Sequence, residues 1–191
     1  MITNHSECAA KTDNELVGLS LDNPDHFLCL TRRYEDKLLR YIMRLSRLDR
    51  EDAEDILQDV FIKTYYNLNE FDSELKFSSW IYRIAHNQTV SEIRKKSVRP
   101  AIPLEDEDLN RFEDTFDVVG AIDNSFDRKK IDEALERIDE KYREVLMLRF
   151  LEEKDYIEIA DILKKPVSTV GNLISRGKVI FKEEYEKLIE K

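Results

Sequence analysis

The sequence has few of the residues that break helices or build tight turns, with only 4 glycines and 4 prolines among 191 residues. Charged residues make up 38% of the chain. This composition favours an all-α fold and argues against a β-sandwich or barrel, which needs many turns. The sequence also lacks any run of about 18 apolar residues, so we expect no membrane-spanning helix and no membrane contact.

Cysteine is equally scarce, since Cys8 and Cys29 are the only two. Two cysteines are too few for a disulfide framework, which fits a reducing cytoplasm as the expected location. The first residues, MITNHSECAAKTDNE, lack the apolar core of a secretory signal. A zinc site could in principle use the His5-x2-Cys8 and His26-x2-Cys29 pairs. However, the first pair lies in a segment expected to be disordered, and Cys29 falls on the apolar side of a helix.

Signatures of catalysis are absent as well. The sequence shows no glycine-rich phosphate loop, no nucleophile elbow and no pair of catalytic carboxylates. We therefore expect a protein that is not an enzyme, with no metal and no cofactor.

The formal net charge of -10 is distributed unevenly. Residues 101–127 hold nine acidic residues against one base, and residues 1–22 hold four against one. The blocks between them are close to neutral, so each is free to carry a basic face. We expect two small helical domains joined by an acidic flexible linker, with the C-terminal domain carrying a helix-turn-helix. The predicted boundaries are a flexible tail at 1–22, a helical domain at 23–99, the linker at 100–125 and the second domain at 126–191.

The first block contains two amphipathic helices before its most unusual segment. One has an apolar stripe at helical spacing, and so does the helix after it. The members of the two stripes are Leu30, Tyr34, Leu38, Tyr41, Ile42 and Leu45, and then Ala53, Ile56, Leu57, Val60, Phe61, Thr64 and Leu68. Acidic residues of positions 49–59 oppose the second stripe, which predicts an exposed acidic surface. Such a surface either attracts a basic protein partner or is simply solvated.

The unusual segment is Phe77 to Lys96, FSSWIYRIAHNQTVSEIRKK, in which aromatic residues alternate with bases. Trp80, Arg83 and Asn87 share one side of the expected helix, and Ser91 and Arg94 continue it. Rings that stack on unpaired bases, beside cations that track phosphates, suit single-stranded nucleic acid. The alternative is that the aromatic rings belong to the core and that the terminal bases only mark the end of a helix.

The last part of the second block predicts a helix-turn-helix. Asp155 is a good N-cap with Glu158 as its reciprocal partner, and Pro166 prevents the helix from continuing. Between Ile162 and Lys182 there are five bases and no acid. The second helix of such a motif enters the DNA major groove, so the pattern predicts DNA binding. An ordinary helical hairpin with a solvated basic face is the alternative.

Together, these pieces resemble the extracytoplasmic-function (ECF) sigma factors, the small alternative initiation factors of bacterial RNA polymerase. DAEDILQDVFIKTYYNLNEFD looks like the helix by which this family binds polymerase. FSSWIYRIAHNQTVSEIRKK looks like the helix that binds the minus-ten element, and YREVLMLRFLEEKDYIEIADILKKPVSTV like the domain that reads the minus-thirty-five element. The resemblance implies that the chain binds core RNA polymerase, at the β′ clamp and the β flap. It also implies promoter DNA as a partner, both duplex and unwound non-template strand, and an anti-sigma protein.

The resemblance also implies which residues make these contacts. For polymerase, the matching positions are Asp52, Asp55, Gln58 and Asp59. For the minus-ten element, where a base flipped from the stack is held, they are Ser73, Lys76, Ser78, Trp80, Arg83, Asn87, Ser91, Arg94 and Lys95. For the minus-thirty-five element, they are Ser168, Thr169, Asn172, Ser175, Arg176 and Lys178.

Some positions depart from the family pattern. The family usually has aspartate where this chain has Ser91, and commonly has glycine, lysine and arginine at Ser168, Gly171 and Leu173. Loss of two bases in the recognition helix implies that the upstream promoter sequence read by this chain is altered. The competing interpretation is a helix-turn-helix regulator that acts without docking on polymerase, and a helical scaffold is a third.

Overall fold

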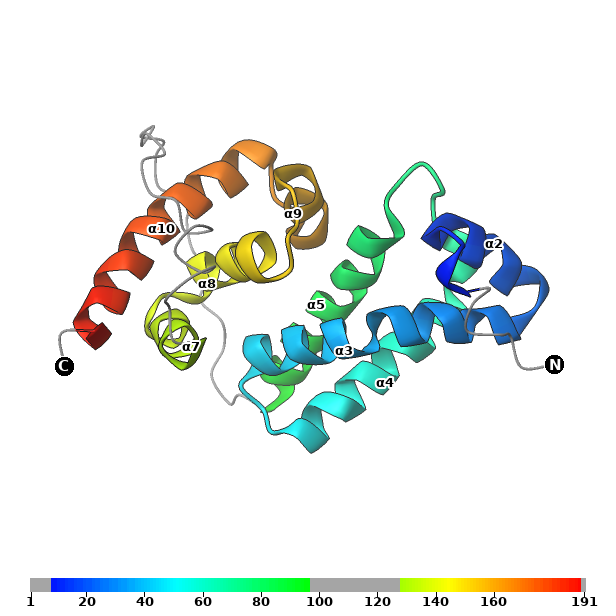
Figure 1. Ribbon diagram of the computed structural model, residues 1–191, viewed down its shortest axis with the longest axis horizontal. Helices are drawn as coiled ribbons and strands as arrows, with labels where there is room; N and C mark the ends of the chain where they lie inside the picture. The colour runs from blue at the N-terminus through cyan, green and yellow to red at the C-terminus, as the bar shows by residue number, and fades with distance from the viewer. Residues whose placement is uncertain (1–7, 97–127, 190–191) are drawn as a thin grey trace. The chain divides into compact units, whose positions relative to one another are not determined.

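The computed structural model describes residues 8–96 and 128–189, and all regular structure within these ranges is helical (Figure 1). Contacts divide the chain into two compact units, residues 1–102 and 103–191. The expected all-α fold with two helical domains is confirmed. The predicted acidic linker at 100–125 lies outside the described residues.

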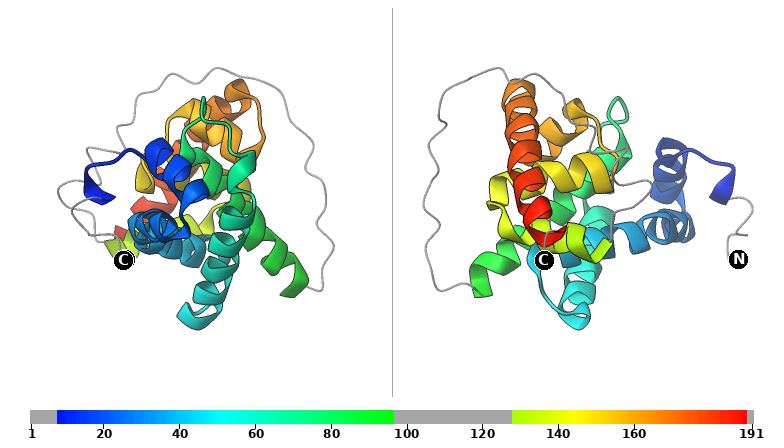
Figure 2. Two further views of the ribbon diagram at one scale, coloured as in Figure 1. Left: turned by 90° about the vertical axis from the view of Figure 1, so that its right-hand side faces the viewer. Right: turned by 60° about the vertical axis from the view of Figure 1, so that its left-hand side comes forward.

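The first unit is built on three long helices that pack against one another in every pairing (Figure 1, Figure 2). The elements are α2 (Asp13–Asp22), η1 (Pro24–His26), α3 (Phe27–Ser46), α4 (Arg50–Tyr66), η2 (Leu68–Glu70) and α5 (Phe77–Lys96). The two apolar stripes expected on α3 and α4 form its core, apart from the half-buried Phe61. Helix α5 adds Ile81, Tyr82 and Ala85, which are at most 1% exposed. Burial of one face of each helix therefore holds this unit together.

Helix α2 corrects the prediction that residues 1–22 form a flexible tail, which is wrong for Asp13–Asp22. A capping box of Thr12 and Glu15 opens the helix. Leu16 is fully buried and Val17 is 6% exposed, because this face packs on α3. A helix of ten residues is marginal by itself, so this packing is its main source of stability.

The cysteines also differ from expectation, because Cys8 and Cys29 form a disulfide. Cys29 is 4% exposed, as expected for the apolar side of its helix. The pairing fastens the segment before α2 to the first turn of α3. Sequence reasoning missed this bond because it placed Cys8 in a disordered tail.

The second unit contains α7 (Arg128–Arg137), α8 (Glu140–Leu146), the π-helical turn η3 (Met147–Leu151), α9 (Tyr156–Leu163) and α10 (Val167–Ile189). Its core lies between α10 and the shorter helices, and includes Val145, Leu148, Ile159 and Ile174, all fully buried. The Asp155–Glu158 capping box is confirmed, with backbone amides donating to the side chains at 2.8 and 3.0 Å. Lys164, in the left-handed conformation, ends α9, and the next helix starts at Val167. This is the expected helix-turn-helix.

The two glycines inside α10 have different surroundings, which leads to a prediction on stability. Among the described residues, a Cβ on Gly171 would meet only Tyr156 Cε2, at 3.8 Å, whereas one on Gly177 would meet Leu146 Cγ at 3.2 Å and Tyr142 Cβ at 3.3 Å. Alanine in a helix is favoured over glycine by about 1 kcal/mol. We expect Gly171→Ala to raise the free energy of unfolding by up to about this amount, because the site is open. Gly177→Ala should gain less or lose stability, since α8 must give way. Chemical denaturation of the two variants measures the difference, and equal gains would contradict close packing at Gly177.

Candidate functional site

The loop that leads into α5 is held by an aromatic cluster and by a local turn. The rings of Phe71, Phe77 and Trp80 lie 5.3–5.7 Å apart, centroid to centroid. Asp72 Oδ1 accepts a hydrogen bond from the Glu74 amide at 3.0 Å, as in an Asx turn. The aromatic rings thus form a packed support from which the exposed residues 72–76 project.

The position of Trp80 corrects one prediction. Its side chain is 7% exposed and packs against Phe71 and Phe77. The expectation of a Trp80 ring presented at the surface for stacking on bases is wrong, and the alternative of a core role holds for Trp80 and for Tyr82, which is 1% exposed. Helical spacing places Trp80 beside Arg83 but does not reveal that the preceding loop folds back over the indole.

The other positions predicted to contact the minus-ten element form one exposed or half-exposed strip. Ser73 and Lys76 are exposed on the loop and Ser78 is half-buried in the first turn of α5. Along the helix, Arg83 is half-exposed, and the others are exposed; these are Asn87, Ser91, Arg94 and Lys95. Positions 83, 87, 91 and 94 follow one face of the helix. The structure therefore brings together a loop and a helix face that carry polar and basic groups.

Lys95, at the end of this strip, is engaged with an acid of its own helix. Its ammonium donates to Glu92 Oε1 at 2.6 Å, and this hydrogen bond, with the charge of Glu92, raises the pKa of Lys95. The lysine stays protonated at neutral pH. A phosphate that binds there must compete with Glu92.

The acidic face of α4 is divided between two kinds of position. Asp55 and Gln58 are exposed. Asp52 and Asp59 instead contact α5: Lys96 Nζ lies 2.5 Å from Asp52 Oδ2, and Gln88 Nε2 donates to Asp59 Oδ2 at 2.9 Å. Sequence reasoning placed all four on one surface and missed the bonds to α5, which depend on how the two helices cross.

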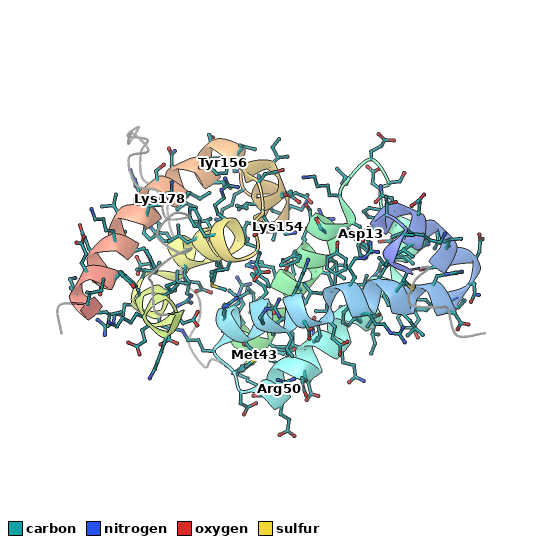
Figure 3. All side chains as sticks on the ribbon, viewed as in Figure 1. Asp13, Met43, Arg50, Lys154, Tyr156 and Lys178 are labelled. Carbon is teal, nitrogen blue, oxygen red and sulfur yellow. A yellow bond between two sulfur atoms is a disulfide. The ribbon has the colours of Figure 1, made fainter. Side chains whose placement is uncertain are left out.

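In the second unit, five of the six predicted upstream positions lie along one side of α10. Ser168 is exposed and the other four are half-exposed, namely Thr169, Asn172, Ser175 and Arg176. Lys178 follows Ser175 by three residues, at the edge of this side, and is half-exposed. Figure 3 labels Lys178 on α10. Its ammonium lies 5.6 Å from the centroid of the Phe150 ring. The role of Lys178 in binding the upstream element stays a prediction, with Phe150 as an additional neighbour of its ammonium.

The described parts of the chain contain no helix long and apolar enough to cross a membrane. Within residues 8–96 and 128–189 there is likewise no cluster of three or more potential metal ligands.

Comparison with known proteins identifies the class to which these features belong. Residues 30–99 match the family described as Sigma-70 region 2, and residues 128–179 match Sigma-70, region 4. The first match covers α4 and α5, and the second covers the helix-turn-helix.

Relatives narrow this class. The chain is 33% identical to the ECF RNA polymerase sigma factor SigW of Bacillus subtilis, over 86% of this chain and 91% of that protein. It is 30% identical to the ECF RNA polymerase sigma-E factor of Haemophilus influenzae, over 93% and 97% of the two chains. The chain belongs to the ECF sigma factors of RNA polymerase. A helix-turn-helix regulator that acts without polymerase is therefore the weaker interpretation.

Solved structures share the fold at lower identity. CnrH, solved in complex with the cytosolic domain of CnrY, superposes with a TM-score of 0.69 at 20% identity, over 93% of this chain and 99% of that one. The sigma factor RpoE of Bartonella quintana, solved with the anti-sigma factor NepR, gives 0.64 at 20% identity, over 84% and 96%. At this identity, the two structures support the fold.

Proposed function

We propose that one strip binds the unwound non-template strand of the minus-ten element. The strip consists of residues 72–76, which are the exposed part of loop 71–77, and of the exposed face of α5. The observation that carries the proposal is the continuity of the strip. The polar loop is supported by packed aromatic rings. It is continuous with one face of the helix, which carries Arg83, Asn87, Ser91 and Arg94. Arginines suit phosphates, while short polar side chains and loop carbonyls suit the edges of a flipped base. Trp80 supports this surface from below and does not stack on a base.

The acidic face of α4 is proposed to bind core RNA polymerase at the β′ clamp. Asp55 and Gln58 are exposed in the free protein, and carboxylates at such a position attract a basic partner and repel DNA. The second unit would then contact the β flap and place α10 on the upstream duplex. Family membership supports these assignments, and we propose that the chain acts in the cytoplasm as a transcription factor without enzymatic activity of its own.

An anti-sigma protein is a further proposed partner. The structures of CnrH and RpoE described above each contain a second protein, which for RpoE is named as an anti-sigma factor. A protein that covers the face of α4 or the strip on α5 would block initiation directly.

The N-terminal half of α10 is proposed to read the minus-thirty-five element. Thr169 and Asn172 lie at the end that approaches base edges in helix-turn-helix proteins, and Arg176 lies one turn further on. Asparagine discriminates adenine through two hydrogen bonds, worth about 1–3 kcal/mol. An arginine on phosphate adds affinity without sequence preference.

This division of roles gives a prediction for promoter binding by the holoenzyme. Asn172→Ala should relax the preference at one base pair of the upstream element by about 1–3 kcal/mol. Arg176→Ala should weaken binding to all sequences about equally and reduce the slope of log affinity against log salt by about one. The measurement is binding of reconstituted holoenzyme to a panel of single-base promoter variants at several salt concentrations.

Gly171→Lys is a comparison variant for this panel, because it adds a charge to the same helix and removes no side chain. A Cβ added at Gly171 makes only ordinary van der Waals contact among the described residues, with Tyr156 Cε2 at 3.8 Å, so the site accepts the first carbon of a side chain. It should strengthen binding to all sequences without adding preference. Uniform weakening by Asn172→Ala would contradict its role as the residue that reads a base.

A further inference from the structure

The Cys8–Cys29 disulfide lies at the edge of the first unit, next to an open pocket. The pocket has a volume of about 210 Å³ and is lined by Cys8, Ala9, Cys29, Arg32 and Arg33. Cys29 is 4% exposed, whereas Cys8 is half-exposed. Arg32 is exposed. A reagent that enters this pocket therefore meets a disulfide and a cationic side chain together.

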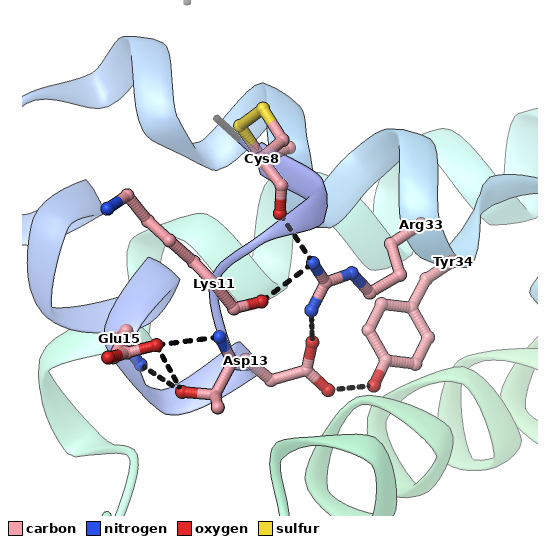
Figure 4. Close-up of polar contacts among 8 residues, drawn as sticks. Cys8, Lys11, Asp13, Glu15, Arg33 and Tyr34 are labelled. Carbon is pink, nitrogen blue, oxygen red and sulfur yellow. Dashed lines mark hydrogen bonds and ion pairs between the residues drawn. A yellow bond between two sulfur atoms is a disulfide. The ribbon is translucent and has the colours of Figure 1, made fainter. Parts of the chain in front are cut away.

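Arg33 organises the segment that the disulfide fastens (Figure 4). Its Nη2 donates to the carbonyl oxygens of Cys8 and Lys11 at 2.8 and 2.9 Å, and its Nη1 lies 2.5 Å from Asp13 Oδ1. The hydroxyl of Tyr34 donates to the other carboxylate oxygen of Asp13. The Arg33 side chain of α3 thus holds the segment that runs from the disulfide to Asp13, the first residue of α2.

Helix α2 in turn reaches the loop that precedes α5 (Figure 1). Asn14 Nδ2 donates to the carbonyl oxygen of Ser73 at 2.8 Å. Leu16, two residues further on, is fully buried. The chain of contacts therefore runs from the disulfide through Arg33 and Asp13 to the middle of loop 71–77.

We propose that Cys8–Cys29 is a reversible redox site that reacts with a low-molecular-weight thiol bearing carboxylates, and that its state sets how firmly α2 braces loop 71–77. Disulfides in a reducing compartment are usually transient or redox-sensing, and accessible ones are the more labile. Arg32 provides the charge that favours an anionic thiol and stabilises a thiolate formed beside it. The effect on DNA rests on the proposed function of the loop and the reducing compartment on the proposed cytoplasmic location, whereas the bracing of the loop by α2 rests on contacts within this unit.

The reaction consumes two thiols for each disulfide. The first thiolate attacks the sulfur of Cys8, the bond between the two cysteine sulfurs breaks, and its electron pair leaves on Cys29, which takes a proton from water. A second thiolate attacks the mixed disulfide and releases Cys8 as a thiolate, which is protonated in turn. Two thiols are oxidised to one external disulfide, and Cys8 and Cys29 are reduced.

Reduction kinetics test the site itself. The oxidised full chain is treated with glutathione, which is anionic, or with neutral 2-mercaptoethanol, and free thiols are trapped by alkylation and counted by mass. Arg32→Gln should slow the glutathione reaction about threefold or more at low salt and leave the 2-mercaptoethanol reaction unchanged. Arg40→Gln, which removes an exposed charge farther along α3, should change neither rate. Equal slowing of both reagents, or two free thiols after treatment with diamide, would overturn the proposal.

Hydrogen exchange, measured without DNA, tests whether the disulfide holds α2 against loop 71–77, which we call the brace. Amides of Asp13–Asp22 and of residues 71–77 should exchange several-fold faster in the reduced chain, and Cys8→Ser should match the reduced chain whatever the redox conditions. Unchanged exchange in both segments would overturn the brace. Faster exchange in the reduced chain, combined with equal promoter opening by oxidised and reduced holoenzyme, would support the proposed bracing of loop 71–77. The same result would reject the role of the loop in opening.

Discussion

Asp55→Lys should weaken binding of the chain to core RNA polymerase at least tenfold, or about 1.4 kcal/mol. Asp55 is exposed at the centre of the acidic face of α4, so reversing its charge replaces attraction to a basic partner with repulsion. Asp52 and Asp59 are poorer choices, because both also contact α5. Their substitution would mix a change at the interface with a change in the fold. The measurement is affinity for core enzyme, with circular dichroism to confirm that the helices are intact.

Glu35→Lys is the matched control for Asp55→Lys. Glu35 is an exposed acid on α3, so its reversal changes the net charge by the same amount away from the proposed interface. It should leave the affinity for core close to that of the wild type at moderate salt. Equal affinities for the two variants would show that the face of α4 is only solvated.

Trp80→Ala should destabilise the first unit by about 3–5 kcal/mol, the usual cost of removing a large buried aromatic side chain. The indole is 7% exposed and contacts two phenylalanine rings, so its loss leaves a cavity under loop 71–77. A single stacking contact with a base would be worth only about 1–3 kcal/mol and would leave folding unchanged. Thermal unfolding therefore separates the two roles.

Asn87→Ala provides the comparison on the same helix. Asn87 is exposed, so its replacement should change the free energy of unfolding by no more than about 0.5 kcal/mol. It should nevertheless impair promoter opening, because it lies on the proposed strip. A melting temperature of Trp80→Ala equal to that of Asn87→Ala would contradict the core role of the indole.

Patterns that depend on a single helix could be predicted from the sequence. The apolar stripes of α3 and α4 identified the core residues, with Leu38 and Ile42 fully buried as expected. The capping box at Asp155 and the stop at Pro166 correctly located the helix-turn-helix. Each of these features involves residues within one or two turns of each other, and helical geometry alone fixes their relation.

Features that depend on contacts between distant segments were not predictable in this way. Helix α2 is short, and its burial depends on α3, so composition alone suggested a tail. Trp80 shares a helical face with polar residues, and only the fold-back of Phe71 explains its burial. The ammonium of Lys178 lies near the ring of Phe150, a contact with another segment that the charge pattern of one helix does not reveal.

The ion pair between Asp52 and Lys96 has a consequence for genetic experiments. It joins the helix proposed to face polymerase to the end of the helix proposed to face promoter DNA, with side chains that are 41% and 48% exposed. A substitution at Asp52 is therefore expected to affect both proposed surfaces, because it removes an acid from one and leaves Lys96 without this partner on the other. Substitutions at Asp52 and Lys96 are therefore expected to have non-additive effects. A search for suppressors of a polymerase-binding defect at Asp52 is expected to yield changes at Lys96.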